Sequence, residues 1–138
     1  MPYNLHIIRT GDFIQMDDKG GFDVEGSKKA LAKLARSCVE SGTMNALLDV
    51  RDAKSDLDFN DVYKVAEAFK EMGFRKSHRL AVLYRSKAGA RVEFFSKPGA
   101  RAEFFAQCAA DKGWNVRAFD DYEQAIDWLS LALPAGSG

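Results

Sequence analysis

Residues 44–53 constrain the fold more than any other part of the sequence. Their apolar side chains Ala46, Leu47, Leu48 and Val50 do not alternate with polar ones in the way a half-exposed strand requires. A strand with this pattern has both faces covered, as in the middle of a parallel sheet with helices on both sides. We therefore predict a central strand here and an α/β fold arranged around it.

The N-terminal segment predicts a β-hairpin. Apolar and polar residues alternate over residues 3–7, which is the period of a half-buried strand. Turn residues follow at positions 10–12, and residues 13–16 can return as the antiparallel partner. The polar, glycine-rich residues 17–21 are expected to form a surface loop.

One helix is predicted before the central strand in the sequence, and a second one after it. The first begins between residues 24 and 27 and continues to about Ser41, because apolar residues recur at helical spacing and a glycine follows. The second starts at Asp58 and Asp61, which have the spacing of a capping box, and ends at Gly73.

The C-terminal part predicts two more strands and two more helices. The strands are expected over residues 80–84 and 115–119, and a helix is expected from about residue 100 to 112. In residues 88–99 only a short helical piece is expected, since Pro98 and Gly99 interrupt the helical pattern.

The last helix is expected to begin at a capping box formed by Asp120 and Glu123. The residues that it should bury are Tyr122, Ala125, Ile126 and Leu129. Together these elements predict one α/β domain over residues 1–133, with a mixed β-sheet of about five strands and about four helices. Residues 134–138 are expected to be a disordered tail.

Charge and hydropathy exclude several classes of function. The 20 lysine and arginine residues balance 20 aspartate and glutamate residues, so no net charge attracts the chain to nucleic acid. No apolar run approaches the roughly 20 residues of a membrane span, and the N-terminus is interrupted by polar residues. We expect a cytoplasmic protein without nucleic-acid binding or stable membrane insertion.

The sequence carries no motif for catalysis or cofactor binding. His6 and His78 are the only imidazoles, and both are expected on the surface because neither belongs to a nucleophile motif. Cys38 and Cys108 fall on apolar stripes without metal-ligand spacing, which predicts inert core thiols and no disulfide framework. Glycine-rich nucleotide-binding loops are absent. We therefore predict a non-enzymatic protein without a cofactor.

Acidic residues gather after the central strand. They are Asp49, Asp52, Asp56, Asp58 and Asp61. Oxygen ligands of this kind suit a hard cation, but helix capping and the helix dipole explain the same carboxylates, and no EF-hand spacing is present. The prediction is no metal site.

Basic and aromatic residues gather between positions 85 and 105, where residues 89–95 are nearly repeated as residues 99–105. The candidate ligand-binding or partner-binding residues are Arg85, Lys87, Arg91, Phe94, Phe95, Lys97, Arg101, Phe104 and Phe105. The simpler interpretation is a solvated basic face over a buried aromatic core, which explains these residues without a binding function. The functional alternative is that they bind an acidic partner or a small amphipathic ligand.

The order of these elements, with residues 47–52 entering a helix and residues 114–119 leading to 125–129, resembles the bacterial SpoIIAA-like proteins of the STAS superfamily. The resemblance covers nearly the whole chain. It implies a SpoIIAA-like fold and a regulatory module, since anti-sigma-factor antagonists bind a partner kinase and are switched by phosphorylation of a serine where the second helix starts. The residues at that position here are Asp58, Phe59, Asn60 and Asp61, and none is a serine.

A related branch, which also resembles CRAL-TRIO lipid carriers, lacks this switch as well, and the chain looks closer to it. The resemblance therefore leaves two functions open. The first is recognition of a protein partner or small ligand without the phosphorylatable serine, and a homodimer is included among the partners. The alternative is a carrier of an apolar or lipid-like ligand.

Overall fold

The computed structural model describes residues 5–9, 13–18, 21–51, 54–55, 57–85 and 100–130. Its central element is β4 (Asn45–Asp49), the middle strand of a five-stranded sheet with the order β1-β2-β4-β6-β7. The apolar run in β4 is covered on both faces, because Ala46 packs into one core cluster and Leu47 into another. The prediction of a central strand is confirmed.

The sheet is mixed, as expected. β2 (Ile14–Asp18), β4, β6 (Arg79–Leu83) and β7 (Asn115–Phe119) run parallel to one another, whereas β1 (Leu5–Arg9) pairs with β2 in the antiparallel direction. The predicted N-terminal hairpin is thus present. Parallel strands end at the same edge, so β2, β4 and β6 place their carboxyl ends side by side.

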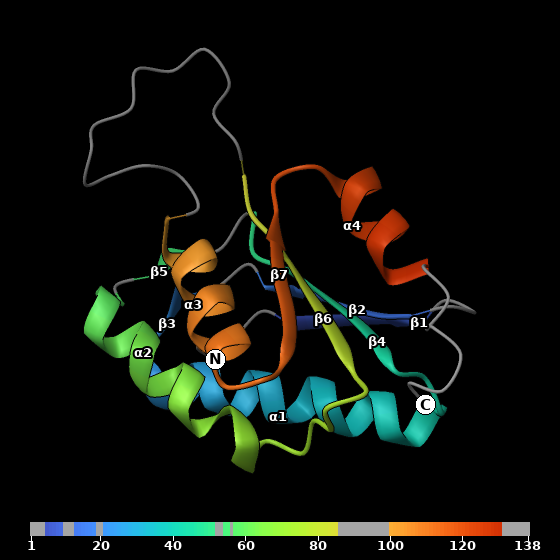
Figure 1. The fold of residues 1–138 in the computed structure, drawn as a ribbon, viewed down its shortest axis with the longest axis horizontal. Coiled ribbons are helices and arrows are strands. Elements are labelled where there is room, and N and C mark those ends of the chain that lie inside the picture. The colour runs from blue at the N-terminus through green and yellow to red at the C-terminus, as the bar shows by residue number, and fades with distance from the viewer. Residues whose placement is uncertain are drawn as a thin grey trace.

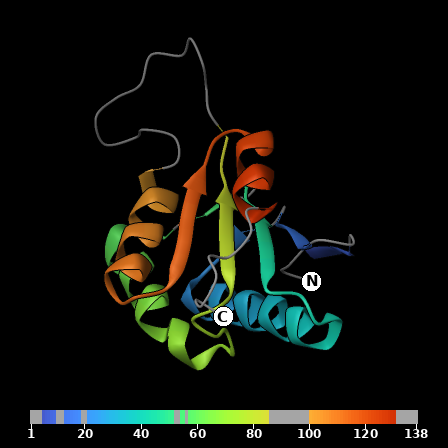
Figure 2. The same cartoon turned by 45° about the vertical axis from the view of Figure 1, so that its right-hand side comes forward.

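Helices cover both faces of the sheet (Figures 1 and 2). α1 (Val24–Ser41), α2 (Phe59–Glu67) and α3 (Ala100–Asp111) lie on one face, and α4 (Tyr122–Ser130) lies on the other. The predicted start and end of α1 are confirmed, since Asp23 caps the first turn and Gly42 ends the helix with φ of 72°. None of the helices within the described residues is long and apolar enough to cross a membrane.

The sheet separates two apolar clusters. The larger one lies between the sheet and α1, α2 and α3, and Phe69 is at its centre, stacked on Phe74 with ring centroids 4.7 Å apart. The smaller one lies between the sheet and α4 and includes Leu47, Leu83 and Leu129. Burial of these side chains supplies most of the free energy that holds the layers together.

Two short strands have no counterpart in the sequence prediction. β3 (Gly21–Phe22) pairs in parallel with β5 (Lys54–Ser55) as a separate two-stranded sheet. Since β2 also continues to Asp18, the expected surface loop over residues 17–21 is wrong at both ends. These two strands could not be predicted from local sequence patterns, because they form by pairing between segments far apart in the chain.

The ends of two helices also differ from the prediction. α2 gives way to a 3-10 helix, η1 (Ala68–Glu71), before Gly73 ends the segment with φ of 108°. At α4 the cap is Asp121 rather than Asp120, because Asp121 Oδ1 accepts from the backbone N–H of Glu123 at 2.9 Å. Tyr122 consequently lies on the first turn and is 39% exposed, not buried. The helical piece predicted in residues 88–99 and the tail over residues 134–138 lie outside the described residues.

Candidate functional site

The first turn of α2 is held by the predicted capping box. Asp58 Oδ1 accepts from the backbone N–H of Asp61 at 2.8 Å, and Asp61 Oδ2 accepts from the backbone N–H of Asp58 at 3.4 Å. The two carboxylates accept hydrogen bonds from N–H groups that a helix start leaves without partners. Their negative charge also interacts favourably with the positive end of the helix dipole. Asp58, Phe59 and Asn60 nevertheless stay exposed on this rigid turn.

Two large aromatic residues of α2 face solvent beside this turn. Phe59 is 43% exposed and Tyr63, one helical turn further, is 40% exposed. The half-buried ring of Phe104 on α3 meets Phe59 edge-on, with centroids 5.3 Å apart and planes at 88°. Lys112, the residue directly after α3, places its Nζ 5.6 Å from the centroid of the Tyr63 ring. We call Phe59, Tyr63, Phe104 and Lys112 the α2–α3 surface.

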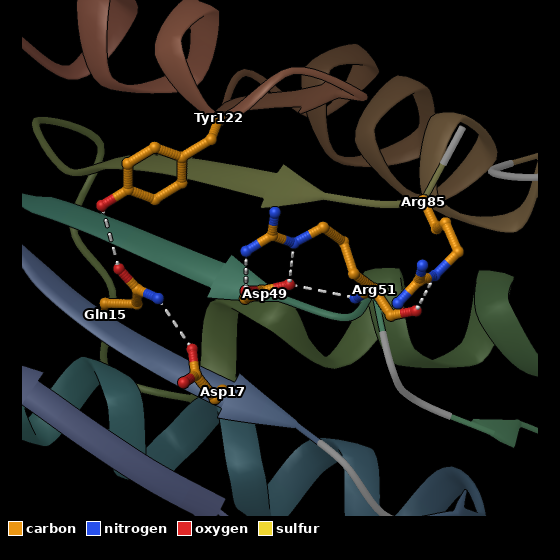
Figure 3. Close-up of polar contacts among 6 residues, drawn as sticks. All are labelled: Gln15, Asp17, Asp49, Arg51, Arg85 and Tyr122. Atoms are coloured by element: carbon orange, nitrogen blue, oxygen red, sulfur yellow. Dashed lines mark hydrogen bonds and ion pairs between the residues drawn. The ribbon is translucent and has the colours of Figure 1, made fainter. Parts of the chain in front are cut away.

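Two of the predicted basic residues donate hydrogen bonds to backbone carbonyls in the connection between β4 and α2. Arg85 Nε donates to the carbonyl of Arg51 at 3.1 Å, and Arg101 Nε donates to the carbonyl of Leu57. The structure thus brings Arg101 to the residue before the α2 cap and Arg85 to the segment after β4. In the sequence these two arginines and the start of α2 belong to separate candidate sites. Arg85 and Arg51 are shown in Figure 3.

The other aromatic candidates divide between core and surface. Phe105 is 7% exposed and meets Phe69 with ring centroids 6.0 Å apart, so it belongs to the larger cluster. Phe104 contributes to the α2–α3 surface. The remaining candidates lie outside the described residues; they are Lys87, Arg91, Phe94, Phe95 and Lys97.

A polar network crosses the carboxyl ends of the parallel strands (Figure 3). Asp49 at the end of β4 is 9% exposed and accepts from Arg51 at three donors, Nε at 3.0 Å, Nη2 at 2.8 Å and the backbone N–H at 3.0 Å. The burial of this carboxylate is therefore compensated by a bidentate ion pair. Within the described ranges no three potential metal ligands converge, and Asp52 and Asp56 lie outside them.

The same network reaches α4 through Gln15, a residue that the sequence analysis did not single out. Tyr122 donates its hydroxyl to Gln15 Oε1 at 3.3 Å, and Gln15 Nε2 donates to Asp17 Oδ1 at 2.8 Å. The guanidinium of Arg51 lies over the Tyr122 ring at 5.9 Å from its centroid. A polar residue at position 15, between the apolar residues Ile14 and Met16, is the signal that could have indicated a buried hydrogen bond.

The titratable groups away from this network serve the fold. His78 is 4% exposed, so its predicted surface position is wrong; its Nδ1 accepts from the backbone N–H of Arg75 at 2.8 Å, and burial lowers its pKa below 6.5. Burial raises the pKa of the fully buried Cys38 thiol to about 11. Burial, with a hydrogen bond donated to Glu103 at 2.9 Å, raises the pKa of Tyr84 to about 12.

Comparison with solved structures identifies the fold. The chain is similar to an anti-sigma factor antagonist from Mycobacterium paratuberculosis, with a TM-score of 0.56, 12% identity, and 92% and 93% of the two chains covered. It is similar to the anti-sigma factor antagonist SpoIIAA in its unphosphorylated form, with a TM-score of 0.53, 13% identity, and 96% and 99% covered.

A third similar structure is an uncharacterised protein with a SpoIIAA-like fold from Shewanella loihica, with a TM-score of 0.50, 18% identity, and 92% and 93% of the two chains covered. No family model and no curated protein sequence matches the chain. The fold expected from the sequence resemblance is therefore confirmed as SpoIIAA-like by structure.

Proposed function

We propose, on the premise of this SpoIIAA-like fold, that the chain is a non-enzymatic recognition module that binds a protein partner through the α2–α3 surface. Two of the similar structures are described as anti-sigma factor antagonists, which supports a regulatory role based on protein binding. The observation that carries the proposal is the exposure of Phe59 on a turn whose backbone is fixed by Asp58 and Asp61.

The aromatic pair suits a protein partner. Exposed aromatic rings on a rigid element lose little conformational entropy on binding, and aromatic residues dominate the energetics of protein interfaces. Phe59 and Tyr63 are separated by one helical turn and therefore present their rings on the same side of α2. Charged residues border the pair, with Asp58 at one end and Lys112 at the other, which provides a polar rim around an apolar centre.

Binding also accounts for the candidate groups better than catalysis does. The Nδ1 atom of His78 is occupied by a backbone hydrogen bond, and the raised pKa of Cys38 disfavours a thiolate. The Asp49 carboxylate is neutralised by Arg51. A carrier of a lipid-like molecule would need apolar side chains around a cavity, whereas Phe105 packs in the core and Phe104 rests on Phe59.

Recognition by this surface would operate without a phosphorylation switch at the start of α2. Asp58 stands at the cap position and supplies a permanent negative charge to the helix start. The nearest hydroxyl before it in the sequence is Ser55. Peptide mapping of the protein purified from its own cells should find no phosphate over residues 55–61, and stoichiometric phosphate there would restore the switch.

Site-specific photo-crosslinking tests the proposed partner surface. A photoreactive phenylalanine analogue at position 59, introduced in the cells that normally make the protein, is expected to crosslink one defined polypeptide. The same analogue at Val39, which is 53% exposed on α1, provides the matched control. Equal crosslinking from both positions, or crosslinking to lipid alone, would contradict the proposal.

A charged variant gives an independent measurement. Phe59→Asp removes the aromatic ring, but an acid in the first turn of a helix is compatible with its dipole, so the fold should survive. We expect this variant to lose the partner in affinity purification while its urea unfolding midpoint stays close to that of the unmodified protein. Val39→Asp should retain the partner.

A further inference from the structure

The far edge of the sheet presents an open strand. β7 pairs with β6 on one side, and within the part of the chain that the structure describes no strand pairs with its other side. Figure 2 shows β7 as the outermost strand, next to β6. Edge strands carry backbone donors and acceptors that can pair with another chain, and proteins commonly protect them with charged side chains.

The register identifies which backbone groups point to this open side. The backbone N–H of Tyr84 donates to the carbonyl of Phe119 at 2.9 Å, so Phe119 directs its backbone groups towards β6. Successive residues of a strand alternate in this respect. Arg117 therefore also pairs with β6, and the N–H and C=O groups of Val116 and Ala118 are directed away from it. Val116 as a whole is only 4% exposed, so the accessible outward groups are those of the half-buried Ala118.

The side chain of Arg117 is oriented at the same place. It is exposed, and its guanidinium lies over two rings on the α4 face, 5.3 Å from the centroid of Phe119 and 5.6 Å from that of Trp128. Stacking on aromatic rings restrains an arginine without using its hydrogen-bond donors. The other side chain over Trp128 is the buried Arg79, whose Nη1 donates to the carbonyl of Trp128 at 2.9 Å.

Arg117 has no acidic partner among the described residues. The ion pairs there join Lys28 to Glu25 and Arg51 to Asp49. A guanidinium presents five N–H donors in a planar fork that matches a carboxylate. Two charges beside Trp128, those of Arg79 and Arg117, add to a local positive potential at this edge.

We propose that the edge of β7 binds an extended segment of a partner protein, which adds a strand to the sheet and places an acidic side chain opposite Arg117. The outward N–H and C=O groups of Ala118 supply the main-chain hydrogen bonds, and the exposed Arg117 supplies the preference for acid. In this mode of recognition main-chain pairing provides affinity, and alternate side chains provide specificity. Arg117 and Ala118 are not part of the α2–α3 surface, so substitutions at these two positions leave the residues of that surface unchanged.

The geometry fixes where the acid must stand in an antiparallel added strand. Because Arg117 pairs its own backbone with β6, its opposite residue belongs to a non-hydrogen-bonded pair, in which the Cα atoms approach to about 4.5 Å and the side chains are close. That side chain lies on the same face of the sheet as Arg117. An acid one position away would point to the other face, towards α3.

Binding of a designed peptide to the purified full chain tests the proposal. The probe is a short, capped peptide of alternating threonine and valine with glutamate at its centre, and the matched probe carries lysine there. We expect the glutamate peptide to bind with a dissociation constant in the millimolar range or below. The dissociation constant of the lysine peptide should be about fivefold higher, as a charge pair worth about 1 kcal/mol implies. The amide proton of Ala118 should exchange rapidly in the free protein and slowly in the complex.

Three variants separate the main-chain and side-chain contributions. Arg117→Glu should reverse the preference so that the lysine peptide binds more tightly, while Arg36→Glu on the exposed face of α1 should leave it unchanged. Ala118→Pro removes an outward N–H and is compatible with an edge strand, so the fold should persist and both peptides should lose binding. Protection of the Ala118 amide in the free protein, equal binding of both peptides, or no binding would each overturn the proposal.

Discussion

At the scale of single residues, Asp58 and Asp61 connect the fold to the proposed binding surface, because the same two carboxylates cap α2 and border Phe59. Asp58→Ala removes the acceptor for the Asp61 N–H and should lower the free energy of unfolding by about 0.5 to 2 kcal/mol. Asn60→Ala, an exposed change in the same turn, should stay within about 0.5 kcal/mol of the unmodified protein. Urea unfolding of both variants provides the measurement, and equal losses would show that the cap contributes nothing.

His78 predicts a dependence of stability on pH. Burial lowers its folded-state pKa below the ordinary value of 6.5, so between these two values the unfolded chain binds a proton that the folded protein does not. Stability from this group is therefore complete above pH 6.5 and falls as the pH drops towards the lowered pKa. His78→Asn keeps an acceptor for the Arg75 N–H but does not titrate, so its unfolding free energy should change less between pH 7.5 and 5.5. An unchanged slope would assign the effect elsewhere.

Individual side chains show where sequence patterns stop being informative. The capping box at Asp58 is local and could be predicted from spacing alone. The burial of His78 could not, because its neighbour Phe74, with a ring centroid 5.7 Å away, is itself packed in the larger cluster against Phe69. The hydrogen bond from Tyr122 to Gln15 could not be predicted for a related reason, since Gln15 lies near the other end of the chain.

At the scale of elements, β4 provides a matched pair of substitutions on adjacent residues. Leu47 is fully buried in the smaller cluster, whereas Leu48, which was expected to be equally buried on the opposite face, is only half-buried against the larger one. Leu47→Ala should cost about 2 to 5 kcal/mol, and Leu48→Ala roughly half as much, because part of its surface is already in water. Chemical denaturation should reproduce this order, and a larger loss for Leu48→Ala would contradict the assigned faces.

Helices and long strands could be predicted because their signals lie within a few residues. α1, α3 and β7 begin and end close to where spacing and glycine positions place them. β3 and β5 are two residues each and exist through pairing with one another, so no local period marks them. The change from α-helix to 3-10 helix at η1 could not be predicted for a different reason. α-Helical and 3-10 spacing bury the same side of a short segment.

At the scale of the whole molecule, the order of elements was sufficient to predict the SpoIIAA-like fold, but not the composition of its surfaces. Phe104 lies next to Phe59 because α2 and α3 follow neighbouring parts of the sheet, a relation that depends on tertiary packing. Arg85 and Arg101 meet the β4–α2 connection for the same reason. Sequence analysis groups residues that are close in the chain. In the fold, the order of the strands decides which residues are close in space.

The separation of the core by the sheet predicts how stability effects combine. Leu47 and Leu129 belong to the smaller cluster, and Leu34 belongs to the larger one; all three are at most 1% exposed. Leu47→Ala combined with Leu129→Ala should be non-additive by about 0.5 to 3 kcal/mol, because the two cavities share neighbours. Leu47→Ala combined with Leu34→Ala should be additive within about 0.5 kcal/mol, since the sheet lies between them. Urea unfolding of the single and double variants provides both cycles. Equal coupling across the sheet and within the smaller cluster would mean that the two faces respond as one core.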